Sequence, residues 1–162
     1  MAQEFDRRAL LGTAALGGIA WLVFRPSPSE ATVRFEVAHT PAEWKQLLGP
    51  ERYHVLREAG TERPFTSPLN KEHRRGTFAC AGCALPLFSS TTKFESGTGW
   101  PSFYRPLPHA VAERSDHSFL MDRTEVLCRR CGSHLGHVFP DGPKPTGLRY
   151  CMNGLALRFR PA

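Results

Sequence analysis

The hydrophobic and polar positions of the chain follow two different rhythms, which meet near Gly76. Before this point apolar residues recur at helical spacing, so that three of them share one face: Trp44, Leu47 and Leu48. Thr40 can cap this segment, with Pro41 in its first turn and Glu43 completing a capping box. We expect a short helix that breaks at the Gly-Pro pair of residues 49–50, and a second short helix over residues 50–59.

After Gly76, short stretches rich in aromatic and β-branched residues alternate with turn residues. The chain contains 14 glycines and 14 prolines, which favours short strands and many turns over long helices. The pattern predicts a small, mainly β domain with antiparallel strands over residues 40–162, in which short N-terminal helices cover one end of a sheet. The expected strands are Thr77–Ala79, Ser118–Met121, Thr124–Cys128, Leu135–Phe139, Leu148–Met152 and Leu155–Phe159.

Residues 1–31 follow neither rhythm and are typical of a targeting segment. Arg7 and Arg8 precede a charge-free apolar run, residues 10–24, that is shorter than the roughly 20 residues needed to span a bilayer. The twin arginine followed by such a run resembles a twin-arginine export signal. We expect an exported, periplasmic protein in which this segment is either cleaved after Ala31 or kept as a membrane anchor, followed by a linker over residues 32–39.

The net charge of +6 belongs entirely to the chain beyond this segment, because residues 1–31 carry three arginines and three acidic residues. A basic balance is compatible with nucleic acid or acidic surfaces as partners. The lysines and arginines are scattered, however, with no more than doublets such as Arg74–Arg75 and Arg129–Arg130. We therefore expect no nucleic-acid partner.

Four of the five cysteines form two Cys-x-x-Cys pairs, Cys80 with Cys83 and Cys128 with Cys131. Two intervening residues let one tight turn aim both sulfurs at one ion, and two such turns complete the tetrahedron that suits zinc. Gly132 directly after the second pair eases its turn. Because 44 residues separate the pairs, a sheet must lie between them, and the zinc would staple its two ends. Structural zinc is the expected cofactor.

Two other arrangements compete with this four-cysteine site. In an oxidising compartment the four cysteines could form two disulfides. Alternatively, Cys128 and Cys131 could bind a metal together with His134 and His137, although His-x-x-His is tighter than the usual finger spacing and the first cysteine pair would be left unused. A twin-arginine substrate crosses the membrane already folded, so that zinc could be loaded before export.

The fifth cysteine, Cys151, has neighbours that favour chemistry over simple packing, although a lone cysteine is most often buried and inert. Arg149 lies two residues away, on the same face of an expected strand, and a cation there favours the thiolate. Asn153 offers an amide for a polar substrate group. If the four paired cysteines bind zinc, His134 and His137 are available as acid or base.

A glycine- and proline-shaped loop carries two large aromatic residues, Trp100 and Phe103. They are either core residues or part of a recognition surface, and the loop alone favours neither. Asp141 begins an Asp-Gly-Pro stretch that indicates a turn.

Taken together, several motifs resemble the type B methionine sulfoxide reductases. The resemblance extends from about Thr40 to Phe159, and the motifs occur in the family's order. They are Tyr53–Arg57 (YHVLR), Thr61–Phe65 (TERPF), Gly97–Phe103 (GTGWPSF), Arg130–Phe139 (RCGSHLGHVF) with Asp141–Pro143, and Arg149–Asn153 (RYCMN).

The resemblance implies a fold of two antiparallel sheets with a four-cysteine zinc site distant from the catalytic centre. It also implies reduction of the R epimer of methionine sulfoxide, free or in oxidised proteins. Cys151 would attack the sulfoxide sulfur, and His137 would protonate the departing oxygen with Asp141 as its orienting partner. The first products would be methionine and a sulfenic acid on Cys151.

The remaining roles also follow from the resemblance. His134 and Asn153 would line the polar side of the substrate pocket, and Trp100 would receive the S-methyl group of the substrate. Phe103 belongs to the same expected substrate-binding loop. Arg149 would favour the thiolate of the nucleophile.

One position departs from the family pattern. Many members carry a resolving cysteine just before the Gly-Trp-Pro-Ser-Phe run, where this chain has Thr98. We therefore expect an external thiol, such as a thioredoxin-like donor, to reduce the sulfenic acid on Cys151. We also expect a monomer with oxidised proteins as its substrates.

Two other classes of function are compatible with parts of the sequence. A zinc-stapled module that binds protein or nucleic acid would explain the cysteine pairs and the basic charge, but not Cys151 or the two histidines. A Cys-x-x-Cys thiol oxidoreductase would need a βαβ context that the strand pattern does not provide.

Overall fold

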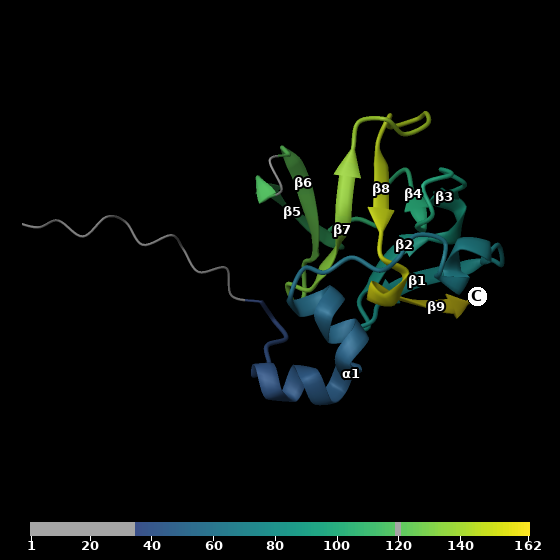
Figure 1. Ribbon diagram of the computed structural model, residues 1–162. Coiled ribbons are helices and arrows are strands. Elements are labelled where there is room, and N and C mark those ends of the chain that lie inside the picture. The colour runs from purple at the N-terminus through teal and green to yellow at the C-terminus, as the bar shows by residue number, and fades with distance from the viewer. Residues whose placement is uncertain (1–34, 119–120) are drawn as a thin grey trace, which may run out of the picture. The chain divides into compact units, whose positions relative to one another are not determined.

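Two antiparallel sheets form the framework of the described residues in the computed structural model (Figure 1). The structure describes residues 35–118 and 121–162, and within these the smaller sheet has the order β2-β1-β9 and the larger β3-β4-β8-β7-β6-β5. The mainly β fold with two antiparallel sheets is therefore confirmed. The strands are β1 (Gly76–Cys80), β2 (Pro86–Ser89), β3 (Lys93–Phe94), β4 (Ser102–Phe103), β5 (Val111–Asp116), β6 (Arg123–Cys128), β7 (His134–Phe139), β8 (Arg149–Met152) and β9 (Leu157–Pro161).

Helix α1 (Pro41–Arg57) consists of two short helical segments that meet at a break, which confirms the two helices expected from the sequence. The predicted capping box is present, since the Thr40 hydroxyl accepts from the Glu43 amide and the Glu43 carboxylate accepts from the Thr40 amide. The kink occurs where the sequence predicts a break, because Gly49 has a φ of 71° that interrupts the helix. Trp44 is buried as expected, whereas Leu47 is 58% exposed and not part of the packed face.

Most expected strands occur at or close to their predicted positions, in β1, β6, β7 and β8. The stretch 155–159 is a strand only from Leu157 onward, because residues 154–156 form a 3-10 turn, η4 (Gly154–Ala156). The predicted strand at 118–121 is wrong for its described residues, and the strand of this region is β5 instead. The pattern of apolar residues did not predict β5, because it is an edge strand with exposed charged residues. Two further short 3-10 turns are η1 (Pro68–Lys71) and η2 (Ser90–Thr92).

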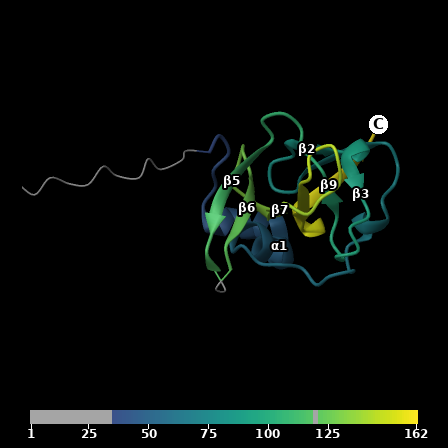
Figure 2. The same cartoon turned by 90° about the horizontal axis from the view of Figure 1, so that it is seen from above.

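The core lies between the sheets and is built around aromatic rings. Phe78 on β1 and Phe88 on β2 come from the small sheet, and both contact Phe103 on β4 of the large sheet, with ring centroids 4.9 and 4.4 Å apart. All three are fully buried. Such ring pairs bury large areas and hold the two sheets at a fixed separation. Figure 2 shows β5 and β6 of the large sheet on one side and β2 and β9 of the small sheet on the other, and Figure 1 shows α1 beneath the strands.

The expected targeting segment, residues 1–31, lies outside the described residues, as do residues 32–34 of the expected linker. The described part of that linker contacts the domain: the Val37 amide donates to the Arg130 carbonyl at 3.0 Å, and Phe35 packs over Gly132. Within residues 35–118 and 121–162, no helix has the length and apolar character needed to cross a membrane.

Candidate active site and metal centre

The four paired cysteines converge on one point. Their sulfur atoms lie within 4.8 Å of one another, and the Sγ atoms of Cys80 and Cys131 are 3.7 Å apart, as those of Cys83 and Cys128 are at 3.5 Å. Four sulfurs around a zinc ion, with Zn–S of about 2.3 Å, lie roughly 3.8 Å apart at the corners of a tetrahedron. The cluster therefore has the dimensions of a tetrahedral metal site.

The two cysteine turns have the same local structure. In each, the first cysteine is the last residue of a strand, and its carbonyl accepts from the amide four residues later: Ala84 to Cys80 at 2.9 Å, and Gly132 to Cys128 at 2.8 Å. The residue after the second cysteine is left-handed in both turns, with φ of 62° at Ala84 and 66° at Gly132. The role expected for Gly132 is thus confirmed, and the other turn adopts the same conformation without glycine.

The protonation chemistry of the four thiols is also consistent with a cation bound between them. The neighbouring thiols and burial together raise the pKa of Cys80, so that it resists losing its proton when no positive charge is present. Thiolates are the metal-binding form, and a divalent cation among them supplies the missing charge. The four sulfurs are free rather than disulfide-bonded, and their separations far exceed the roughly 2.05 Å of a disulfide.

The cysteine cluster lies between the two sheets, in agreement with the expected fold of two antiparallel sheets stapled by a four-cysteine site, and not at the two ends of a single sheet. Cys80 ends β1 of the small sheet, and Cys128 ends β6 of the large sheet. Helix α1 reaches the same place, because Arg57 donates to the Cys131 carbonyl at 3.0 Å and lies over the ring of Trp44. A bound ion would therefore connect both sheets beside the helix.

Cys151 belongs to a different place, in the middle of the large sheet. It lies on β8 and is the direct cross-strand partner of His137 on β7. Both side chains reach a pocket of about 160 Å³. The pocket wall is formed by Thr61, Trp100, Arg123, Gly136, His137, Phe139, Cys151 and Asn153. Strand register thus brings together the two residues that the sequence assigned as nucleophile and acid.

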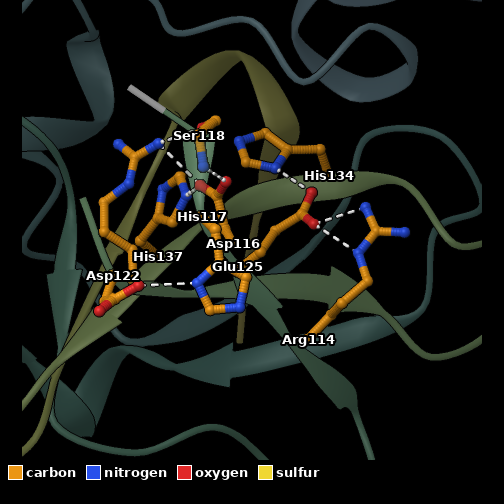
Figure 3. A network of polar contacts seen from close by, with 9 residues as sticks. Arg114, Asp116, His117, Ser118, Asp122, Glu125, His134 and His137 are labelled. Carbon is orange, nitrogen blue, oxygen red and sulfur yellow. Dashed lines mark hydrogen bonds and ion pairs between the residues drawn. The ribbon is translucent and has the colours of Figure 1, made fainter. Parts of the chain in front are cut away.

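His137 is held by Asp116, a residue that the sequence did not indicate (Figure 3). The Nε2 atom of His137 and Oδ2 of Asp116 are 2.8 Å apart, and Arg123 donates to the same oxygen at 2.7 Å. This corrects the expected role of Asp141, whose carboxylate pairs with Arg149 instead at 2.8 and 2.9 Å. No sequence motif links these two residues, because Asp116 ends the edge strand β5 and is 21 residues from His137.

The electrostatics of this pair fix the state of the ring. Hydrogen bonds from Ser118, followed by that of His137, hold the pKa of Asp116 below its usual range, so the carboxylate is ionised and only accepts. Nε2 of His137 must then carry a proton. Burial lowers the pKa of His137 and outweighs the opposite effect of Asp116, so the ring is mainly neutral at neutral pH.

His134 has its own carboxylate partner, Glu125 (Figure 3). The Nδ1 atom of His134 lies 2.7 Å from Oε1 of Glu125, whose other oxygen accepts two hydrogen bonds from Arg114. His134 is only 3% exposed, and its ring packs edge-on against His137 with centroids 5.4 Å apart. It is not part of the pocket wall, which corrects the expectation that it lines the pocket directly.

Arg149 and Asn153 flank Cys151 on the chain. Asp141 first, and Cys151 to a smaller extent, raise the pKa of Arg149, which is therefore a permanent cation beside the sulfur. Asn153 is buried, and its side chain accepts from the Glu62 amide at 3.0 Å and donates to the Leu135 carbonyl at 3.2 Å. Asn153 lines the pocket, with its side chain held by these two hydrogen bonds.

Glu62 is a second residue that the sequence did not indicate. Its buried carboxylate accepts from the amides of Gly154 and Leu155, at the start of the turn that follows β8 and Cys151. Its carbonyl accepts from the indole of Trp100 at 3.1 Å, and its amide donates to Asn153. Glu62 therefore ties two walls of the pocket together, while burial raises its pKa.

The aromatic loop divides into two roles. Trp100 lines the pocket, as expected. Phe103 is fully buried between the sheets, which corrects its assignment as a substrate-binding residue. Thr98, the residue that the sequence resemblance places where a resolving cysteine is expected, has its hydroxyl 3.7 Å from the Cys151 sulfur.

Comparison with known proteins agrees with this site. The SelR domain matches residues 48–161, a span that includes both cysteine turns and the pocket. A protein of Thiobacillus denitrificans named "Peptide methionine sulfoxide reductase MsrB" is 59% identical over 75% of this chain and 93% of its own length. The chain belongs to the type B methionine sulfoxide reductases. The family resemblance seen in the sequence is thereby confirmed.

Relatives from distant organisms carry the same name. One from Leptospira interrogans is 53% identical over 79% of this chain and 98% of its own length. Another, from the archaeon Methanosarcina barkeri, is 56% identical over 76% of this chain and 88% of its own length. In each case the shared region covers most of both proteins.

Proposed function

We propose that this protein reduces the R epimer of methionine sulfoxide, in oxidised proteins and as the free amino acid, to methionine. Family membership supports the reaction class. The observation that carries the residue assignment is the cross-strand pair of Cys151 and His137 in one pocket with Trp100. A thiolate, an acid and an apolar wall within one small pocket are what sulfoxide reduction by a thiol requires.

In the proposed reaction, the Cys151 thiolate attacks the sulfoxide sulfur while the sulfoxide oxygen takes up a proton. The S–O bond to methionine breaks, and the oxygen ends on the Cys151 sulfur as a sulfenic acid. Methionine sulfur is reduced by two electrons, and the cysteine sulfur is oxidised by two. Arg149 stabilises the thiolate as a fixed cation.

His137 delivers the proton to the sulfoxide oxygen in this mechanism. Because Asp116 accepts at Nε2, the nitrogen left for the substrate is Nδ1. That nitrogen is a base in the neutral ring, so it can first take the proton of the Cys151 thiol and then pass it to the oxygen. The lowered pKa of His137 makes the protonated ring a strong proton donor once it forms.

The two faces of the pocket support a preference for one epimer. Trp100 and Phe139 offer apolar surface for the S-methyl group, while His137 and Asn153 offer polar atoms for the oxygen. Only one epimer places oxygen and methyl correctly while its sulfur faces Cys151.

We propose that the four-cysteine site holds structural zinc, bound by Cys80, Cys83, Cys128 and Cys131. The dimensions of the sulfur cluster and the matched turns support this assignment. Zinc there would cross-link the two sheets and take no part in the reaction. Metal analysis of freshly purified protein should give one zinc per chain, and a substoichiometric value would count against it.

An external thiol, such as a thioredoxin-like donor, is proposed to reduce the sulfenic acid. Among the residues that the structure describes, no other cysteine is placed to resolve the sulfenic acid on Cys151. The side chain beside its sulfur is that of Thr98, and the other four cysteines form the metal cluster. Attack of one thiol on the sulfenic acid would release water and form a mixed disulfide. A second thiol would then release the Cys151 thiol and form an external disulfide.

From the sequence alone we propose export to the periplasm by residues 1–31, and a monomeric enzyme that is either released by cleavage after Ala31 or held at the membrane. N-terminal sequencing of the exported protein distinguishes the two forms. A start at residue 32 indicates cleavage, and a start at Met1 indicates the anchored form.

The function is tested with N-acetyl-(R)-methionine sulfoxide and an oxidised protein, using dithiothreitol as reductant. We expect wild type to form methionine from the R epimer at least about a hundredfold faster than from the S epimer. Cys151→Ser should lose at least about a thousandfold in kcat. The variant should retain its metal. Equal activity of wild type and variant would disprove the role of Cys151.

A further inference from the structure

Phe65 is the most exposed large hydrophobic residue in the described part of the chain, at 72%. Its backbone is left-handed, with a φ of 66°, which is unfavourable for a bulky side chain. Neither the exposed ring nor the strained backbone benefits the fold. Such strain persists where the surroundings enforce it, and it often marks a functional surface.

The surroundings that enforce it belong to the active site. The Phe65 amide donates to the Gly99 carbonyl at 2.7 Å, and Asn70 donates to the same oxygen at 2.9 Å. Trp100 follows directly, and its indole is tied to the Glu62 carbonyl. The loop that carries Phe65 is thus fixed to the loop that carries Trp100, so the ring has a defined place relative to the pocket.

A hollow beside Phe65 shares one lining residue with the pocket that contains Cys151. Phe65, Phe94 and Trp100 supply apolar surface to this hollow of about 60 Å³, which polar residues such as Lys93 and Glu95 also line. Trp100 lines the Cys151 pocket as well. A side chain at the hollow and a methionine sulfoxide in the pocket would therefore both lie close to this indole.

We propose that Phe65 and the adjoining hollow bind an apolar side chain that flanks the oxidised methionine in a peptide substrate. The occupant is an extended, unfolded segment of a protein, because its backbone must be free to place neighbouring side chains in both the pocket and the hollow. This inference rests on the proposed function and adds a sequence preference to it. Methionine is apolar and is commonly surrounded by apolar residues in protein cores, which are exposed when a protein unfolds.

The test compares two five-residue peptides, each with a central R-methionine sulfoxide flanked by leucines or by glycines. The quantity measured is the ratio of kcat/KM for the leucine peptide to that for the glycine peptide. Wild type should prefer the leucine peptide by roughly three- to tenfold. Phe65→Ala should bring the ratio close to one, and Phe65→Leu should restore most of it. General damage to the enzyme would lower both values and leave the ratio intact.

The matched control is Leu47→Ala, which removes another exposed apolar side chain, 58% exposed on α1 and outside both the hollow and the pocket. Its ratio should equal that of wild type. A wild-type ratio of one, or an unchanged ratio in Phe65→Ala, would overturn the inference while leaving the proposed function in place. If wild type reduces neither peptide, the proposed function itself fails. Sedimentation of wild type as a dimer that Phe65→Ala dissociates would assign the surface to a second copy, and would also overturn it.

Discussion

The five cysteines occupy two sites that are built in opposite ways. The metal centre consists of four like groups from two matching turns, in which each sulfur has other sulfurs within 4.8 Å. The pocket around Cys151 consists of unlike groups, with a cation, an imidazole and an indole arranged around one sulfur. The first arrangement suits a shared cation, and the second suits a reaction in which one thiol changes its bonding.

The difference lies in what enforces each geometry. Each cysteine turn is a local structure, because one backbone hydrogen bond between residues four apart fixes the positions of both of its sulfur atoms. In the pocket, the register of β7 against β8 sets Cys151 against His137, and loops from distant parts of the chain supply Trp100 and Glu62. Changes in the metal centre should therefore affect the whole fold, whereas changes in the pocket should affect mainly the reaction.

The test with the largest expected effect replaces one cysteine of each site by alanine, in two separate variants. Cys131→Ala removes a ligand from the link between the sheets, and should lower the free energy of unfolding by at least about 3 kcal/mol with loss of metal. Cys151→Ala should keep its metal and remain within about 1 kcal/mol of wild type while losing activity. Urea denaturation and metal analysis measure both. Similar stability losses in the two variants would contradict the division into a structural and a reactive site.

Glu62→Gln tests the frame that joins the pocket walls. The carboxylate accepts from the amides of Gly154 and Leu155, and an amide side chain can replace only one of these acceptors. We expect a loss of about 1–3 kcal/mol in unfolding free energy, from a buried donor left without a partner. Metal content should stay unchanged.

The matched control is Glu95→Gln, whose side chain is 69% exposed and pairs with Lys93. It should change stability by less than about 0.5 kcal/mol. Equal effects of the two substitutions would mean that Glu62 does not tie the pocket together.

Asp116→Asn tests the acid in the pocket. Asp116 raises the pKa of His137 against the larger effect of burial, so losing the carboxylate lets that pKa fall further. Less of the ring is then protonated at a given pH, and the limb on which kcat/KM falls with rising pH should move to lower pH. Activity near neutral pH should fall roughly tenfold, part of what general acid catalysis contributes.

Asp122→Asn is the control for this effect. Asp122 lies in the same hairpin, but its side chain is 92% exposed and pairs with His117 instead. Its pH profile should coincide with that of wild type. A shifted profile in this variant as well would assign the effect to the hairpin as a whole.

The mildest change is Thr98→Cys, which should alter the fate of the oxidised enzyme more than its first turnover. The Thr98 hydroxyl is 3.7 Å from the Cys151 sulfur, so an introduced thiol could reach the sulfenic acid and form a disulfide. Mass spectrometry after one turnover without reductant should show the bond in the variant. In wild type the same experiment should show a sulfenic acid, and an intramolecular disulfide to Cys151 there would contradict regeneration by an external thiol.

The sequence by itself determined the features that arise from neighbouring residues. The Cys-x-x-Cys spacing predicts the two turns because a single hydrogen bond across four residues sets both sulfurs. The capping box of Thr40 and the break at Gly49 follow from local backbone preferences, and both are present. Cys151 could be singled out because the paired cysteines account for the other four, and the family resemblance identified the chemistry.

Only the tertiary structure decided which groups act together in the pocket. Sequence distance gave no reason to pair His137 with Asp116 or Trp100 with Glu62, because strand register and loop packing make those contacts. Tertiary packing also buries Phe103 in the core and leaves Phe65 at the surface, although both phenylalanines lie near glycine- or proline-rich turns. Local preferences set the form of a turn or helix, but the partner of a buried polar group is chosen by whichever strands and loops pack beside it.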